Sequence, residues 1–173
     1  MSNPSAATPH DGWAEVRAGD QVIRYRRHGA GRPVLVLQPH GPTCSPLLNA
    51  LSPRFRLLLP ELPVAGAEVA ARLALFLDGL GMTDVAVVAF GALCLPALEL
   101  ALLAGDQVGR LALVLDGRSA MPELDGALVT APGQAPLALV LIRDDGSTAE
   151  EVPGLVRFLG VAAPEPLLAR PGE

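Results

Sequence analysis

Short apolar runs that alternate with segments of helical periodicity constrain the fold of this 173-residue chain more than any other feature. The runs contain almost no polar residues, as expected for strands buried on both faces of a sheet. Because such strands alternate with helical segments, we predict an α/β fold with a mostly parallel central sheet and helices on both faces. The predicted buried strands are Pro33–Gln38, Phe55–Leu59, Val85–Ala89, Leu111–Leu115 and Leu137–Ile142.

The other predicted elements complete a single domain. Trp13–Ala18 and Gln21–Arg27 are expected to form an antiparallel hairpin around the turn Gly19-Asp20. Helical spacing or capping signals predict four helices, namely Pro46–Leu51, Ala65–Leu80, Leu93–Ala104 and Thr148–Leu159. We therefore expect a flexible leader over residues 1–12, one domain over 13–160 and a C-terminal tail over 161–173.

The charged residues exclude several classes of function. All 13 basic residues are Arg, so neither Schiff-base chemistry nor a phosphate-binding Walker lysine is available. The net charge is -5, and the acids and bases are interspersed. Arg24, Arg26 and Arg27 form the one basic cluster, and the first two share a face of their strand. We interpret that face as a solvated edge and expect no nucleic-acid partner.

No cofactor, metal or membrane anchor is predicted. The two cysteines and three histidines lack metal-ligand spacing, and no glycine-rich dinucleotide motif follows a strand. Val85–Ala104 is apolar apart from Glu99, but Gly91 and Pro96 interrupt it, so we predict a buried strand and a buried helix. The first residues do not resemble a signal peptide, and a cytoplasmic location is expected.

Several weak motifs, in order, resemble the α/β-hydrolase superfamily over about residues 13–117. Residues 29–37 followed by His40-Gly41 are similar to that family's third strand and oxyanion loop. The helix, strand and turn over 47–63, and the elements over 84–111, resemble the segments that follow. The resemblance implies a truncated hydrolase-like domain without a lid domain and without an eighth strand.

Two departures from the family pattern affect its chemistry. The Gly-x-Ser-x-Gly elbow falls on residues 89–93, where Gly91 takes the nucleophile position and Leu93 replaces the second glycine. The turn is therefore expected to lack a nucleophile and to differ in backbone shape from the family's elbow. The family's general base follows the last strand, but no histidine follows His40. Asp144 or Asp145 matches the acid position, with no imidazole to orient. Conventional serine-hydrolase activity is not expected.

The resemblance places a remnant ligand pocket at the carboxyl ends of the strands. Its expected residues are His40, Gly41, Cys44, Phe90, Gly91, Ala92 and Asp116. His40, Cys44 and Asp144 are the candidates for any remaining catalysis. Each also has a structural interpretation, since a loop histidine can hold a turn, a single cysteine is usually a small buried hydrophobe and an aspartate can cap a turn.

Four functions remain open. The first is a non-hydrolytic protein that binds a small apolar or peptide-like ligand, or a protein partner, in the remnant pocket. Exposed apolar surface would then favour a homodimer. The second is a lyase, isomerase or cyclase of specialised metabolism that uses His40 or an aspartate as acid or base. The third is a hydrolase in which His40 activates Cys44. The fourth is a fragment without a function of its own.

Overall fold

The computed structural model describes residues 12–39, 46–62, 68–116, 138–144 and 148–160. Seven strands are present in these ranges: β1 (Gly12–Ala18), β2 (Gln21–His28), β3 (Arg32–Leu37), β4 (Phe55–Pro60), β5 (Val85–Phe90), β6 (Val108–Asp116) and β7 (Ala138–Asp144). The helices are α1 (Pro46–Leu51), α2 (Val69–Gly79), the short 3-10 helix η1 (Gly91–Leu93), α3 (Cys94–Leu103) and α4 (Thr148–Gly160).

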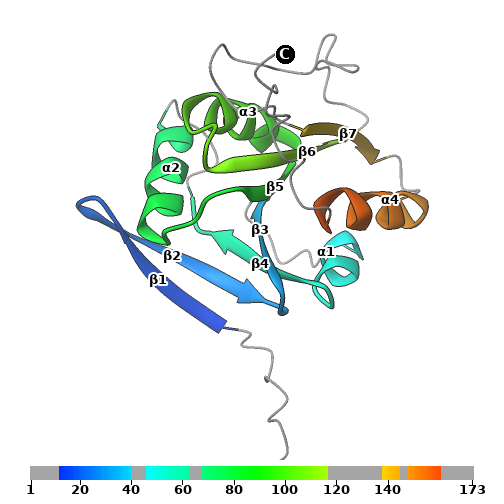
Figure 1. Cartoon of the computed structure of the whole chain (residues 1–173), viewed down its shortest axis with the longest axis horizontal. Helices are drawn as coiled ribbons and strands as arrows, with labels where there is room; N and C mark the ends of the chain where they lie inside the picture. The colour runs from blue at the N-terminus through cyan, green and yellow to red at the C-terminus, as the bar shows by residue number, and fades with distance from the viewer. Residues whose placement is uncertain (1–11, 40–45, 63–67, 117–137, 145–147, 161–173) are drawn as a thin grey trace, which may run out of the picture.

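The described strands form one sheet in the order β1-β2-β4-β3-β5-β6-β7 (Figure 1). β1 pairs with β2, and β2 with β4, in antiparallel orientation. The pairs β3–β4, β3–β5, β5–β6 and β6–β7 are all parallel. The prediction of a mostly parallel sheet is therefore confirmed, with the predicted hairpin at one edge.

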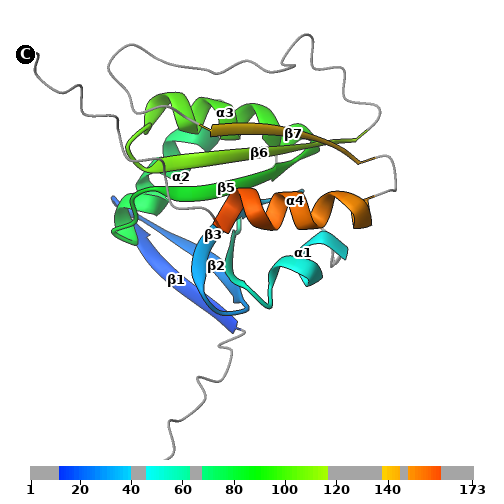
Figure 2. The same ribbon diagram turned by 45° about the vertical axis from the view of Figure 1, so that its right-hand side comes forward.

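Helices cover both faces of the sheet, as the sequence predicted (Figure 2). α2 and α3 pack on one face, where the buried side chains include Leu73 and Phe76 of α2 and Leu35 of β3. α1 and α4 pack on the other face, against alternate residues such as Val34 and Val36. Because successive side chains of a strand point to opposite faces, the apolar runs supply both cores at once.

The apolar segment Val85–Ala104 divides as predicted into a strand and a helix. β5 is buried from Val85 to Ala89, and α3 buries the residues that face the sheet, Ala97 and Leu100 among them. The described helices include none with both the length and the apolar character needed to cross a membrane. The segment therefore contributes to the domain core.

The hairpin of β1 and β2 covers α2 with only one of its faces. Val16 and Ile23 are buried against α2, and the Tyr25 ring meets the Phe76 ring edge-to-face with centroids 5.2 Å apart. The opposite face of the hairpin carries Trp13 and Arg24, which are both exposed. The outer face of the hairpin is therefore an exposed surface with polar and aromatic side chains.

A charged cluster lies where β3, β5 and β6 begin. Arg32 Nη2 is 2.8 Å from Asp84 Oδ2, and Asp84 has a positive φ of 52°. Arg110 is 3% exposed, and its Nη1 is buried without a hydrogen-bond partner in the structure. Burial lowers the pKa of Arg110, the positive charge of Arg32 lowers it further, and Asp84 opposes both effects. The charged form of Arg110 is therefore less favourable in the folded than in the unfolded chain.

Replacing Arg110 by methionine is expected to leave the melting temperature unchanged or to raise it. The lowered pKa disfavours the charged folded form at every pH below it, so the change removes a cost that exists at acidic and neutral pH. Arg32→Met is the matched control, because it removes the partner of Asp84 and should lower the melting temperature by about 2–4 °C. A clear loss of thermal stability in Arg110→Met by calorimetry would contradict the expectation.

Candidate functional site

The carboxyl ends of the parallel strands bring together the segments that the sequence selected. Leu37 at the end of β3 lies opposite Ala89, and Phe90 at the end of β5 lies opposite Val114. At the next pair of ends, Asp116 lies directly opposite Asp144. The backbones of Phe90, Asp116 and Asp144 thus end at one edge of the sheet, where ligands bind in folds of this kind.

The turn at Gly91 keeps the strand–turn–helix form of an elbow. Gly91 follows β5, has a φ of 53° and begins η1, which leads directly into α3. A Cβ atom built on Gly91 meets no other atom within 4 Å, so a side chain here would enter open space. Gly91 therefore has the left-handed backbone that glycine adopts readily, in a strand–turn–helix arrangement like that of a nucleophile elbow.

The residues beside Gly91 have unequal exposure. Phe90 is half-buried and packs on the core beneath α1 and α4, whereas Ala92 is exposed. Leu93, at the position of the second family glycine, is buried within η1. A short 3-10 turn thus precedes α3, and the Leu93 side chain is buried in the core.

Cys94 belongs to the core, as is usual for a single cysteine. Its buried thiol has one proton to donate, and two carbonyl oxygens lie within reach of the sulfur, that of Ala89 at 3.4 Å and that of Val114 at 3.6 Å. These contacts tie the first turn of α3 to the ends of β5 and β6. They hold the start of α3, which follows the turn at Gly91, and the sulfur is buried away from solvent.

The structure describes some of the candidate reactive residues and not others. His40, Gly41 and Cys44 lie outside the described residues, and only the backbones of Asp116 and Asp144 are placed. The one described histidine, His28, ends β2 opposite Leu57. Because β2 is antiparallel to β4, His28 lies toward the amino edge of the parallel strands, away from Gly91. Among the described residues, therefore, no imidazole lies at the edge that carries the elbow.

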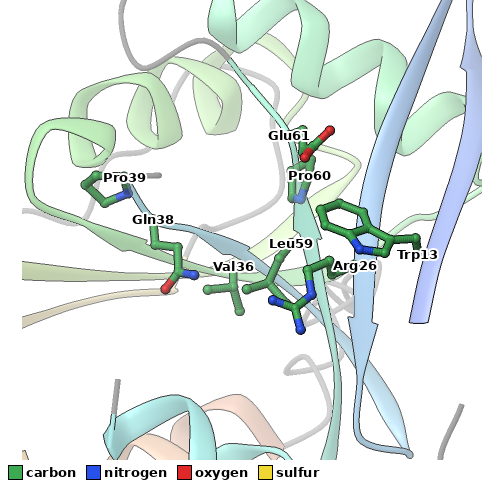
Figure 3. A pocket seen from close by; sticks show the side chains of 8 residues that line it. All are labelled: Trp13, Arg26, Val36, Gln38, Pro39, Leu59, Pro60 and Glu61. Carbon is green, nitrogen blue, oxygen red and sulfur yellow. The ribbon is translucent and has the colours of Figure 1, made fainter. Parts of the chain in front are cut away.

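A small pocket that the sequence interpretation missed lies beside the hairpin (Figure 3). It has a volume of about 150 Å³ and is formed by the hairpin and by the carboxyl ends of β3 and β4. Its lining residues are Trp13, Arg26, Val36, Gln38, Pro39, Leu59, Pro60 and Glu61. Within the described ranges, no three His, Cys, Asp or Glu side chains are grouped closely enough to hold a metal ion.

Two arginines lie over the Trp13 ring, and one of them, Arg26, lines the pocket. The guanidinium carbons of Arg24 and Arg26 lie 5.0 and 5.6 Å from the ring centroid. Arg24 also pairs with Glu15 at 3.6 Å and with Glu61 at 4.0 Å. The prediction that Arg24 and Arg26 share a face is confirmed, and both side chains are exposed, as expected for a solvated face. Arg26 also lines the pocket.

The register of the hairpin was the signal that could have revealed this arrangement. A two-residue turn at Gly19-Asp20 pairs Ala18 with Gln21, and the same register places Trp13 opposite Arg26. The pairing follows from the turn length alone, because each step away from the turn adds one residue on each strand. The adjoining parts of β3 and β4 could not be placed in the same way.

Comparison with known proteins shows similarity of fold. No protein-family model matches the chain, and no curated protein matches it significantly. An alpha/beta fold family hydrolase from Bacillus anthracis str. Sterne matches with a TM-score of 0.51 and 14% identity, over 60% of this chain and 43% of that one. A membrane phospholipase A, a bacterial virulence factor, matches with a TM-score of 0.50 and 21% identity, over 60% of this chain and 39% of that one.

The aligned part thus spans about two fifths of the length of these hydrolases. At such identities the likeness concerns the fold alone. The chain has an α/β fold whose mixed, mostly parallel sheet resembles part of an α/β-hydrolase core.

Proposed function

We propose that this protein is a non-hydrolytic α/β-hydrolase-like protein, which binds a small apolar or peptide-like ligand or a protein partner at the carboxyl edge of its sheet. The observation that supports this proposal most directly is Gly91. The elbow backbone is retained with a φ of 53°, but the residue has no side chain. A scaffold that keeps its turn and lacks its nucleophile can still hold a ligand at the strand ends.

The positions of the histidines support the same proposal. Acyl transfer by a serine requires an imidazole that removes the hydroxyl proton and later returns it to the leaving group. No histidine follows His40 in the sequence, and the described His28 lies toward the opposite edge. An acidic residue at Asp144 would then have no imidazole to orient. Association into a homodimer stays a prediction.

Restoring the hydroxyl should therefore not restore hydrolysis. Gly91→Ser is expected to fold, because the Cβ enters open space, with a loss of about 1–2 kcal/mol from the positive φ. Neither the wild-type protein nor Gly91→Ser should be labelled by a fluorophosphonate or release p-nitrophenol from a p-nitrophenyl ester. Intact mass and absorbance at the p-nitrophenolate band measure the two outcomes.

Gly91→Ala is the matched control, since it has the same backbone strain and no hydroxyl. Stoichiometric labelling of any serine in the wild-type protein, with matching ester turnover, would refute the proposal. Turnover in Gly91→Ser but not in Gly91→Ala would show that a general base is present after all. Native mass spectrometry of freshly purified protein then searches for the ligand, and a bound small molecule is the expected result.

A further inference from the structure

We propose that the pocket beside Trp13 binds a small aromatic carboxylate and that Arg26 is its anion-binding residue. The pocket is built from β1, β2, β3 and β4, whereas Gly91 follows β5. The pocket lies at the same carboxyl edge of the sheet, but Gly91 does not line it, so binding here does not depend on the turn at Gly91. The inference depends on three properties of the pocket, namely an arginine without a carboxylate partner, a flat aromatic wall and a volume close to that of one ring.

The first property concerns the pairing of charges. The two neighbouring carboxylates, those of Glu15 and Glu61, both form ion pairs with Arg24. Arg26 is exposed and has no ion pair among the described residues, and a ligand can reach its hydrogen-bond donors while the guanidinium lies over the Trp13 ring. A guanidinium presents its donors as a planar fork that matches a carboxylate in bidentate geometry. Arg26 is therefore the group in this pocket that is suited to bind an organic acid.

The second property is the shape of the walls. Trp13 is 51% exposed, so part of its indole surface is available to a ligand although Arg24 and Arg26 lie over the ring. Val36 and Leu59 line the pocket beside Arg26, and Gln38 lies on the far side of them from Trp13 (Figure 3). A planar ring can lie against the indole and the aliphatic side chains while its carboxylate reaches the guanidinium. The Gln38 amide offers a further donor.

The third property is size. The pocket has a volume of about 150 Å³. A buried apolar cavity of about that volume holds one benzene molecule in a well-studied case. The present pocket is open to solvent on one side, so the expected ligand is a single ring whose carboxylate stays partly hydrated. Glu61 opposes an anion by charge repulsion, although Arg24 offsets part of its charge. Binding should therefore be modest, with a Kd at or below about 1 mM.

The test follows the indole N–H signal of Trp13 by ¹H–¹⁵N NMR. Trp13 is the only tryptophan in the chain, so its indole signal reports on this pocket without ambiguity. The full-length protein is titrated with benzoate, with benzyl alcohol as the neutral probe and with benzylamine as the cationic probe. Benzoate is expected to shift the signal saturably and to bind at least about tenfold more tightly than either of the others, because only benzoate forms a charge-assisted pair with Arg26.

Three variants assign the effect to residues. Arg26→Gln should weaken benzoate binding by about tenfold or more, because the ion pair is lost. Arg17→Gln removes a positive charge from an exposed residue of β1 that does not line the pocket, and its affinity should stay within about twofold of wild type. Glu61→Gln should strengthen binding by about two- to threefold, because it removes the repelling carboxylate.

Four outcomes would overturn the assignment. These are a shift that stays linear over the whole titration, equal affinity for benzoate and benzyl alcohol, tighter binding of benzylamine, and unchanged affinity in Arg26→Gln. The comparison of the three probes uses the wild-type protein alone, so it decides the question even if a variant does not fold. This experiment does not measure ester turnover. Its result is therefore independent of whether the proposed function is correct.

Discussion

Replacing Gly29 by alanine is expected to lower the free energy of unfolding by about 3–6 kcal/mol, enough to leave much of the protein unfolded. Gly29 joins β2 to β3 with a φ of 79°, which side-chain-bearing residues rarely adopt. A Cβ at this position would also collide with the backbone carbonyl oxygens of Ser52 and Phe55. These are main-chain atoms, one in the turn after α1 and one in the first residue of β4, so they cannot move away as a flexible side chain could.

Gly81→Ala separates the two contributions. Gly81 has a φ of 63°, but a Cβ there meets nothing within 4 Å. Its substitution should therefore cost only the strain of the positive φ, about 1–2 kcal/mol. Urea unfolding followed by far-UV circular dichroism measures both variants against wild type. Equal losses in the two variants would show that the collision at Gly29 is relieved, and the close packing of β2, α1 and β4 would then be in doubt.

Replacing Phe76 by alanine is expected to cost about 3–5 kcal/mol. Phe76 is fully buried in α2 and meets the Tyr25 ring edge-to-face. Its removal leaves a cavity between the helix and the inner face of the hairpin, where Val16 and Ile23 also pack. Because the hairpin carries Trp13 and Arg26, the loss of Phe76 should weaken the packing of the hairpin on α2 and thereby disturb the pocket beside Trp13.

Leu75→Ala is the control for this substitution, since Leu75 is adjacent in α2 and 42% exposed. Its loss should be below about 1 kcal/mol, because little apolar area is removed from the interior. Chemical denaturation gives the two free energies, and hydrogen exchange of the β1 and β2 amides reports on the hairpin. If Phe76→Ala were as stable as Leu75→Ala, the proposed packing of the hairpin on α2 would be wrong.

The sequence was informative about the strands and helices because local patterns determine them. The runs over β3, β4 and β5 are almost entirely apolar, with Arg32 and Arg56 as the exceptions, and are bounded by turns, so their existence and type follow from residue order. The beginning of β6 was less visible. The strand begins at Val108, three residues before the predicted Leu111, since Gly109 and the charged Arg110 interrupt the apolar pattern. Arg110 is tolerated there because the negative charge of Asp84 lies nearby. That proximity arises from the tertiary structure and could not be predicted from the local sequence.

The candidate site divides in the same way. The motif spacing around β5 predicts that Gly91 takes the place of a nucleophile, and this stays a prediction. The structure gives Gly91 a left-handed φ. The helix predicted over Ala65–Leu80 is described as α2 from Val69, and residues 63–67 lie outside the described ranges. The pocket beside Trp13 was missed, because it joins the hairpin to the ends of β3 and β4.

By itself, the order of residues determined the α/β class, the two-sided burial of the central strands and the absence of a histidine after His40. These depend on periodicity and composition, which act over a few residues at a time. Only the tertiary structure decided that β4 lies between β2 and β3, and thereby that Arg26 faces Leu59 and the end of β3. The physical reason is that strand order arises from the packing of distant segments, and no local pattern encodes which edges will meet.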